Sequence, residues 1–177
     1  VDTMPKVITV DVEDNENITM VNQKAAAGYP HNIQDVDWYR QLPAFDFPLP
    51  QYRNATYRGF QVEGDSMMPN LRPEDWVLAK AIPSLSDASD HKIYVVVMYD
   101  TVVVKKLHKL ADPSKIRLVS LNEEYAPFEV KVSDIQELWQ VTSKLTFSLD
   151  ANSENSMLRQ LQASMEELKS QLNSFKR

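Results

Sequence analysis

The chain has 177 residues, of which 43% are hydrophobic and 25% are charged, and its formal net charge is -6. This length is sufficient for one domain with a hydrophobic core plus an appendage, whereas the acidic balance argues against direct binding to nucleic acid phosphates. No cysteine is present, which excludes disulfides, thiolate metal sites and cysteine nucleophiles. The only glycines are Gly28, Gly59 and Gly64. A glycine-rich phosphate-binding loop is therefore excluded, and we expect each glycine to lie where no other residue fits.

No apolar stretch reaches the roughly 20 residues of a membrane-spanning helix, and the absence of cysteine is compatible with the cytoplasm. We therefore expect a cytoplasmic protein that contacts no membrane and needs neither a cofactor nor a metal. The chain begins at Val1 without an initiator methionine or a signal-peptide pattern. We expect that a further segment once preceded this residue.

Residues 1 to 55 form an irregular region, in which we expect an N-terminal arm or linker. Lys6–Val12 alternates like a strand, and Ile18–Val21 has the composition of a second one. The small residues Ala25–Gly28 follow and indicate a loop. Several prolines then interrupt the chain up to residue 50, which makes long helices improbable there.

Residues 56 to 149 have the pattern of short strands rich in β-branched residues, with turn signals between them. Without alternating helical segments, this pattern predicts a mostly β domain of curled sheets. The expected strands are Tyr57–Val62, Trp76–Ile82, Ile93–Tyr99, Val102–Leu107, Ile116–Leu121, Phe128–Val132 and Leu138–Phe147.

Residues 150 to 177 have a different period, with apolar residues spaced alternately by three and four. This heptad seam predicts an α-helix, which either docks on its own domain or forms a short coiled coil with a second copy. We favour the coiled coil, and hence a homodimer, because polar residues surround the seam. Its members are Leu158, Leu161, Met165, Leu168, Leu172 and Phe175.

Ser66 is the candidate nucleophile, because it follows a predicted strand that ends near Gly64. A serine at such a junction can project its hydroxyl beside unpaired backbone N–H groups, which are the components of a nucleophile with an oxyanion site. The commoner use of Asp65 or Ser66 at such a position is to cap a turn. Residue chemistry alone leaves both interpretations open.

The base for such a serine is more plausibly a lysine than one of the three histidines, none of which lies in a recognisable triad. A lysine has an ordinary pKa near 10.4, and burial can lower that value far enough for the neutral amine to act at neutral pH. Lys105 and Lys106 follow the β-branched run Val102–Val104. Strand alternation places these lysines on opposite faces, and since both faces are partly apolar, it does not choose between them.

Three features occur together in this sequence: Phe60-x-Val-x-Gly-Asp-Ser-Met-x-Pro69, Asp75-x-Val77, and the strands around Ile93 and Val104-Lys-Lys-Leu107. With them the sequence resembles the self-cleaving serine peptidase domain of LexA, UmuD and lambda-type repressors. This resemblance implies a curled-sheet fold, related to signal peptidases, over about residues 25 to 149. It also implies a Ser66 nucleophile with Lys105, 39 residues later, as its general base.

The resemblance further implies that the substrate is the chain's own Ala27-Gly28 bond, in a loop upstream of the serine. Cleavage would inactivate a transcriptional repressor whose DNA-binding domain preceded Val1. In the family, a RecA filament often provokes this cleavage during the SOS response to DNA damage. Two departures, Glu74 and His91, stand where the family commonly has glycine, which puts the geometry of two turns in doubt. The C-terminal heptad segment is not part of the family domain.

Two other functions remain open. The chain could be a non-cleaving dimerisation module of a phage-type regulator, with a silent Ser66–Lys105 dyad. It could also be an enzyme similar to signal peptidases that cuts other proteins, although the lack of a membrane segment weakens that interpretation.

Overall fold

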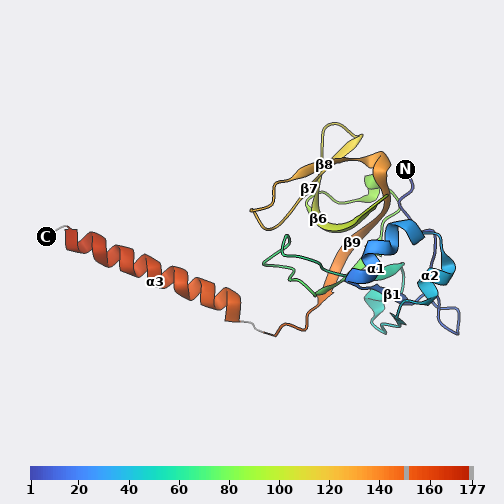
Figure 1. Cartoon of the computed structure of the whole chain (residues 1–177), viewed down its shortest axis with the longest axis horizontal. Helices are drawn as coiled ribbons and strands as arrows, with labels where there is room; N and C mark the ends of the chain where they lie inside the picture. The colour runs from blue at the N-terminus through green and yellow to red at the C-terminus, as the bar shows by residue number, and fades with distance from the viewer. Residues whose placement is uncertain (150–151, 176–177) are drawn as a thin grey trace. The chain divides into compact units, whose positions relative to one another are not determined.

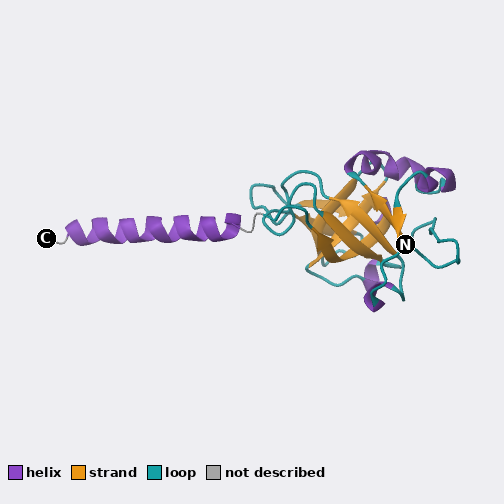
Figure 2. Ribbon diagram, turned by 90° about the horizontal axis from the view of Figure 1, so that it is seen from below, coloured by secondary structure: helices purple, strands orange, loops and turns teal. Residues whose placement is uncertain are grey.

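The computed structural model describes residues 1–149 and 152–175. The chain divides into two compact units, Val1–Thr146 and Phe147–Arg177. The first unit holds all the strands, and Figure 2 shows them at its centre with short helices and loops around them. The second unit consists mainly of one helix. The mostly β architecture agrees with the fold predicted from the sequence.

The strands of the first unit form one mixed sheet in the order β2-β1-β3-β4-β9-β5-β6-β7-β8. Strand β1 pairs in parallel with β3, and every other neighbouring pair is antiparallel. The long strand β9 lies in the middle of this order and joins its two halves (Figure 1). The strands are β1 (Ile18–Val21), β2 (Ala44–Phe45), β3 (Tyr57–Gln61), β4 (Trp76–Ala81), β5 (Lys92–Met98), β6 (Val102–Lys109), β7 (Lys115–Val119), β8 (Phe128–Lys131) and β9 (Ile135–Leu145).

Strand β5 explains how the sheet builds a core on both of its faces. Successive side chains of a strand point to opposite faces, and in β5 both sets are buried. Val95 and Val97 join a cluster that contains Phe60 and Trp139, whereas Tyr94, Val96 and Met98 pack with a second cluster that contains Leu107 and Leu138. A strand buried on both sides reads as a continuous apolar run, which is the pattern of Ile93–Met98 in the sequence.

The seven strands expected between residues 56 and 149 are all present, with ends that differ by a few residues. The expected strand Ile18–Val21 is also confirmed, as β1. The prediction of a strand at Lys6–Val12 is wrong, because the structure has there only one isolated bridge, between Val10 and Glu16. The Asp11 carboxylate accepts hydrogen bonds from the backbone N–H groups of Glu13 and Asn15, and such a side-chain-capped turn competes with strand pairing.

The segment between β1 and β2 folds into short helices. Helix α1 (Gln23–Gly28) leads directly into the 3-10 helix η1 (Tyr29–Asn32), and α2 (Val36–Arg40) follows. Further single-turn 3-10 helices are η2 (Pro50–Tyr52), η3 (Leu85–Asp87) and η4 (Val132–Asp134). The segment Ala25–Gly28, expected to be a loop, is therefore helical.

In the second unit, helix α3 (Asn152–Phe175) is continuous (Figure 1). The six members of the predicted heptad seam are all exposed, with relative exposures between 57% and 88%. An apolar stripe of this kind is normally covered by a partner. Among the described residues, no helix is both long enough and apolar enough to cross a membrane.

Candidate active site

Ser66 lies in the turn that connects β3 to β4. Gly64 has a φ of 73°, a left-handed conformation that glycine adopts without strain. A Cβ built on it would meet nothing within 4 Å, so its conformation, and not its surroundings, favours glycine there. Met67, next to Ser66, is buried in the core. One buried neighbour and one tight turn thus fix the chain on both sides of the serine.

Lys105 lies on β6 and contacts Ser66 directly. Its Nζ donates a 2.5 Å hydrogen bond to Ser66 Oγ. The amine is half-buried, and this burial lowers the pKa of Lys105, since removal from water disfavours the charged form. In the described part of the chain, no carboxylate forms a salt bridge with Lys105. The site therefore contains a hydroxyl bonded to an amine whose pKa is lowered by burial.

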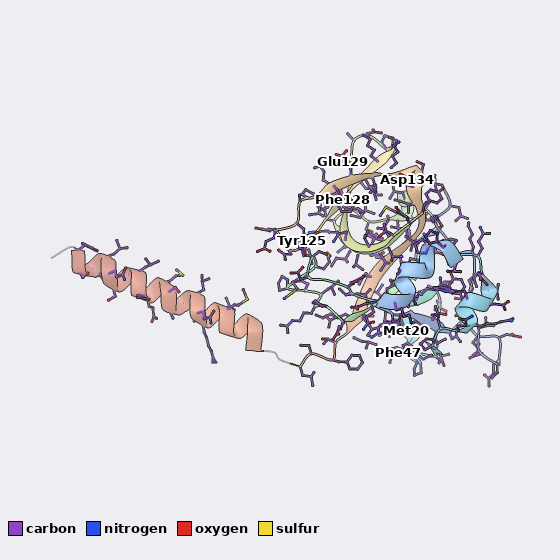
Figure 3. The ribbon with its side chains drawn as sticks, viewed as in Figure 1. Met20, Phe47, Tyr125, Phe128, Glu129 and Asp134 are labelled. Carbon is purple, nitrogen blue, oxygen red and sulfur yellow. The ribbon has the colours of Figure 1, made fainter. Side chains whose placement is uncertain are left out.

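The loop that follows β7 supports the Ser66 turn from the other side. The Asn122 backbone N–H donates to the Ser66 carbonyl at 2.9 Å, and the Asn122 side-chain amide donates to the Asp65 carbonyl. Tyr125, labelled in Figure 3, donates a 2.5 Å hydrogen bond to the Asp65 carboxylate, and its ring centroid lies 5.9 Å from Lys105 Nζ. The sequence analysis did not identify Asn122 or Tyr125, because no local pattern links this loop to a serine more than fifty residues earlier.

Ser66 and Lys105 open into a small cavity of about 150 Å³. Its wall is formed largely by β3, by the Ser66 turn and by the start of β6. One further residue comes from helix α1. The lining residues are Ala26, Phe60, Gln61, Val62, Glu63, Ser66, Met67, Val102, Val103, Val104 and Lys105. The helix that carries the predicted cleavage site thus contributes Ala26 to the cavity wall.

Ala27 and Gly28, the predicted cleavage site, form the last turn of α1. The Asn22 side chain caps the start of this helix by accepting from the backbone N–H of Ala25. At the other end, the Asn32 side-chain amide donates to the Gly28 carbonyl at 2.7 Å. The structure therefore brings Ser66 and Lys105 together, whereas the Ala27-Gly28 bond is held in a closed helical turn whose neighbour Ala26 lines the cavity.

The chain matches the family model of Peptidase S24-like proteins over residues 19–142. This chain belongs to the Peptidase S24-like family. The prediction of a LexA- and UmuD-type peptidase domain is thereby confirmed, and the domain is that of a serine peptidase family. No curated protein is similar enough to give a match.

The backbone conformations of Glu74 and His91 show how the chain accommodates its two departures from the S24-like pattern. Glu74 has a φ of 73° and His91 a φ of 61°. Both residues thus adopt the left-handed conformation that a glycine would take without strain. The two turns keep the geometry expected of a glycine-containing turn, and the strain falls on the two side-chain-bearing residues.

Directly after the predicted cleavage site, Tyr29 is anchored in a buried polar cluster. Its hydroxyl donates to Glu137 Oε2 at 2.5 Å and accepts a short hydrogen bond from the Arg58 guanidinium. Trp139 Nε1 also donates to Glu137 Oε2, at 3.0 Å. Arg58, Glu137 and Tyr29 are all at most 1% exposed. The S24-like domain therefore fixes the residue that follows Gly28 very firmly.

The histidines and other metal-binding side chains add nothing to this site. His91 and His108 pack edge to face with ring centroids 4.2 Å apart, and neither lines the cavity of Ser66. In the described residues, no group of three histidine, aspartate or glutamate side chains is arranged to hold a metal ion.

Proposed function

We propose that this chain is the regulatory C-terminal part of a LexA-like transcriptional repressor and that it cleaves its own Ala27-Gly28 bond. Ser66 is the nucleophile and Lys105 the general base. The observation that carries the proposal is the 2.5 Å hydrogen bond from Lys105 Nζ to Ser66 Oγ, made by an amine whose pKa is lowered by burial. Membership of a serine peptidase family supports the same reaction.

In the proposed reaction, neutral Lys105 accepts the Ser66 hydroxyl proton while Ser66 Oγ bonds to the Ala27 carbonyl carbon. The tetrahedral intermediate then breaks the C–N bond to Gly28, and Lys105 returns the proton to the departing amine. Water, deprotonated by the same lysine, hydrolyses the ester on Ser66. The products are a new carboxylate on Ala27 and a new amino terminus on Gly28.

This reaction requires α1 to open first, because the Ala27-Gly28 bond lies in its last turn, where Asn32 holds the Gly28 carbonyl, and the bond must reach Ser66 Oγ. Helix α1 has six residues, none of them buried, and a helix this short has little stability of its own. Once it opens, the tethered bond has a high effective concentration at the serine. A substrate on the same chain thus needs no extended recognition pocket.

The proposal includes partners that act on either side of this domain. A DNA-binding domain ahead of Val1 would supply the contact with DNA, and a second copy of the chain would pair through α3 and form a homodimer. A RecA filament would act as the inducing signal, in the cytoplasm, by favouring the opened form of α1.

The test is incubation of the purified protein at raised pH, with mass spectrometry used to detect a fragment that begins at Gly28. The expected rate is independent of protein concentration and is abolished by Ser66→Ala and by Lys105→Ala. Lys106→Ala is the matched control, since the neighbouring lysine makes no contact with Ser66, and it should cleave like wild type. Cleavage that persists in Ser66→Ala would contradict the assignment of the nucleophile.

A second function, a non-cleaving dimerisation module, is favoured by one observation. The Ala27-Gly28 bond lies in a helix capped by Asn22 and closed by Asn32. In that case α1 never opens, and the dyad is silent. This alternative would be favoured if wild-type protein and the Asn22→Ala variant, in which α1 loses its cap, both stay intact through long incubation at raised pH.

A further inference from the structure

We propose that residues 1–27 stay bound to the rest of the domain after the Ala27-Gly28 bond is cut. The space between β2 and β3 is then a binding site for one extended peptide, the chain's own N-terminal arm. The cut itself rests on the proposed function, whereas the binding site does not depend on how the bond is broken. A consequence is that cleavage and separation are two distinct steps.

Strand β1 is an interior strand of the sheet. It pairs in parallel with β3 on one side and antiparallel with β2 on the other. Both of its edges are therefore satisfied by residues that lie after Gly28 in the chain. A peptide held by main-chain hydrogen bonds in this way binds by strand addition.

The side chains of β1 are packed against residues that lie downstream in the chain. Ile18, Thr19 and Val21 are at most 4% exposed. Met20, labelled in Figure 3, pairs with Gly59 of β3, and a Cβ built on Gly59 would overlap the Met20 sulfur and lie 2.8 Å from its Cε. The Met20 side chain thus occupies the space that a side chain at position 59 would need.

The N-terminal arm has a second set of contacts near its beginning, at Thr3. Thr3 is 1% exposed, and its hydroxyl donates a 2.5 Å hydrogen bond to the Ile82 carbonyl. Its backbone N–H donates to the Pro83 carbonyl, and its carbonyl accepts from Leu138. Between these anchors and β1, Arg58 donates to the Val7 carbonyl at 2.7 Å. Contacts distributed over about twenty residues hold the arm to the part of the domain that lies beyond the cut.

On the other side of the cut, Tyr29 is held by Arg58 and Glu137. Breaking the Ala27-Gly28 bond removes no hydrogen bond of β1 and neither of the bonds that the Tyr29 hydroxyl makes to Arg58 and Glu137. The hydrogen bond from the Tyr29 backbone N–H to the Ala26 carbonyl does span the cut. An upstream domain would therefore leave only when β1 dissociates from β2 and β3, and this step would control the time of separation.

The experiment uses the full chain with Ser66→Ala, so that it cannot cut itself, and with a recognition site for a specific protease inserted between Ala27 and Gly28. After complete cutting, size-exclusion chromatography is run in native buffer and in denaturant. The expected result is co-elution of both fragments in native buffer and their separation in denaturant. Separate elution of residues 1–27 in native buffer would overturn the proposal.

Variants of the arm decide whether β1 is responsible. Val21→Asp should release the cut arm roughly tenfold faster or more, because it places a charge in the core. Val12→Asp is the matched control, since Val12 is fully exposed, and it should release the arm at the parent rate. Gly59→Val tests the same contact from β3 by crowding Met20 and should also accelerate release. Equal retention in all three variants would overturn the assignment to β1.

The two proposals fail separately. Absence of self-cleavage in the wild-type chain would contradict the peptidase proposal, and retention of the arm after cutting by an added protease would still support the binding site. Conversely, rapid release of the arm would overturn the binding site and leave the Ser66–Lys105 reaction untouched.

Discussion

The Tyr125 hydroxyl donates a 2.5 Å hydrogen bond to the Asp65 carboxylate, and this bond connects the loop after β7 to the residue that precedes Ser66. Because the same tyrosine ring lies 5.9 Å from Lys105 Nζ, one side chain bonds to the neighbour of Ser66 and lies beside Lys105. Tyr125 is therefore a positioning residue for the proposed reaction, since its hydroxyl holds Asp65, the neighbour of Ser66.

We expect Tyr125→Phe to slow self-cleavage by roughly threefold to tenfold, because an exposed hydrogen bond contributes about 0.5–1.5 kcal/mol. The ring beside Lys105 is kept, so the pH dependence of the rate should keep its midpoint while its plateau falls. Tyr99→Phe is the control, because Tyr99 is exposed and forms no hydrogen bond in the described structure. A shifted midpoint in Tyr125→Phe would instead mean that its hydroxyl tunes the lysine.

Lys105 should make self-cleavage dependent on pH. Burial lowers the pKa of Lys105 below its ordinary value of 10.5, and the reaction needs the neutral amine. The rate should therefore rise about tenfold per pH unit well below that lowered pKa and level off above it. Rates of Gly28 fragment formation between pH 6 and 10 measure this dependence, and a rate that falls with increasing pH would contradict a lysine base.

The same shift has a consequence for stability. Burial in the folded state disfavours protonated Lys105. Between the lowered pKa and 10.5, the folded protein therefore binds fewer protons than the unfolded protein. The free energy of unfolding consequently rises with pH through that window. Lys105→Met, which removes the buried charge, should be at least as stable as wild type at pH 7. Urea unfolding at pH 7 and pH 10 measures the difference, which should shrink at the higher pH.

Much of the fold could be predicted because each strand is recognisable from its own residues, without knowledge of its neighbours in the sheet. The β-branched run of β5 and β6 predicted both strands, and the Gly-Asp-Ser turn predicted where one strand ends. The choice between Lys105 and Lys106 could not be made from alternation, since neighbouring faces of a curled sheet are both partly buried. The resemblance to a family made that choice, and the hydrogen bond from Lys105 to Ser66 agrees with it.

The failures have physical causes that composition does not show. The Asp11 side chain ends the strand expected at Lys6–Val12 by capping a turn, and the Asn22 cap together with tertiary contacts makes a helix from the small residues expected to form a loop. The expectation that each glycine lies where nothing else fits holds for Gly59 and Gly64. It fails for Gly28, which has an ordinary φ of -91° and room for a Cβ.

Glu74 should be a position where glycine stabilises the fold. Its φ of 73° imposes a cost that glycine does not have, of about 1 kcal/mol. Glu74→Gly is expected to raise the free energy of unfolding by roughly that amount, measured by urea denaturation. Glu123→Gly, in an exposed turn without a positive φ, serves as the control and should lower it slightly because of the added chain entropy. A loss of stability in Glu74→Gly would show that the carboxylate itself supports the turn.

Arg58 should contribute far more to stability than an exposed arginine in a comparable ion pair. Its guanidinium lies 4.0 Å from the Glu137 carboxylate, and both side chains are buried, whereas the Arg117–Glu129 pair is more than 40% exposed. Arg58→Met leaves a buried carboxylate without its cation, and we expect a loss of about 3–5 kcal/mol. Arg117→Met should cost at most about 1 kcal/mol. Equal unfolding midpoints for the two variants would contradict the structural role of the buried cluster.

Helix α3 should hold two copies of the chain together through its heptad seam. The seam residues are exposed along the whole helix, and pairing with an identical helix would bury all of them at once, with each residue packed between residues of the partner. Leu168→Asp places a charge in the seam and should convert a dimer to a monomer, as measured by sedimentation equilibrium at concentrations of tens of micromolar. Ser170→Asp, which lies outside the seam on the same helix, is the matched control and should remain dimeric. Wild-type protein that is monomeric at these concentrations would contradict the coiled coil, and a Leu168→Asp dimer would place the dimer contact outside α3.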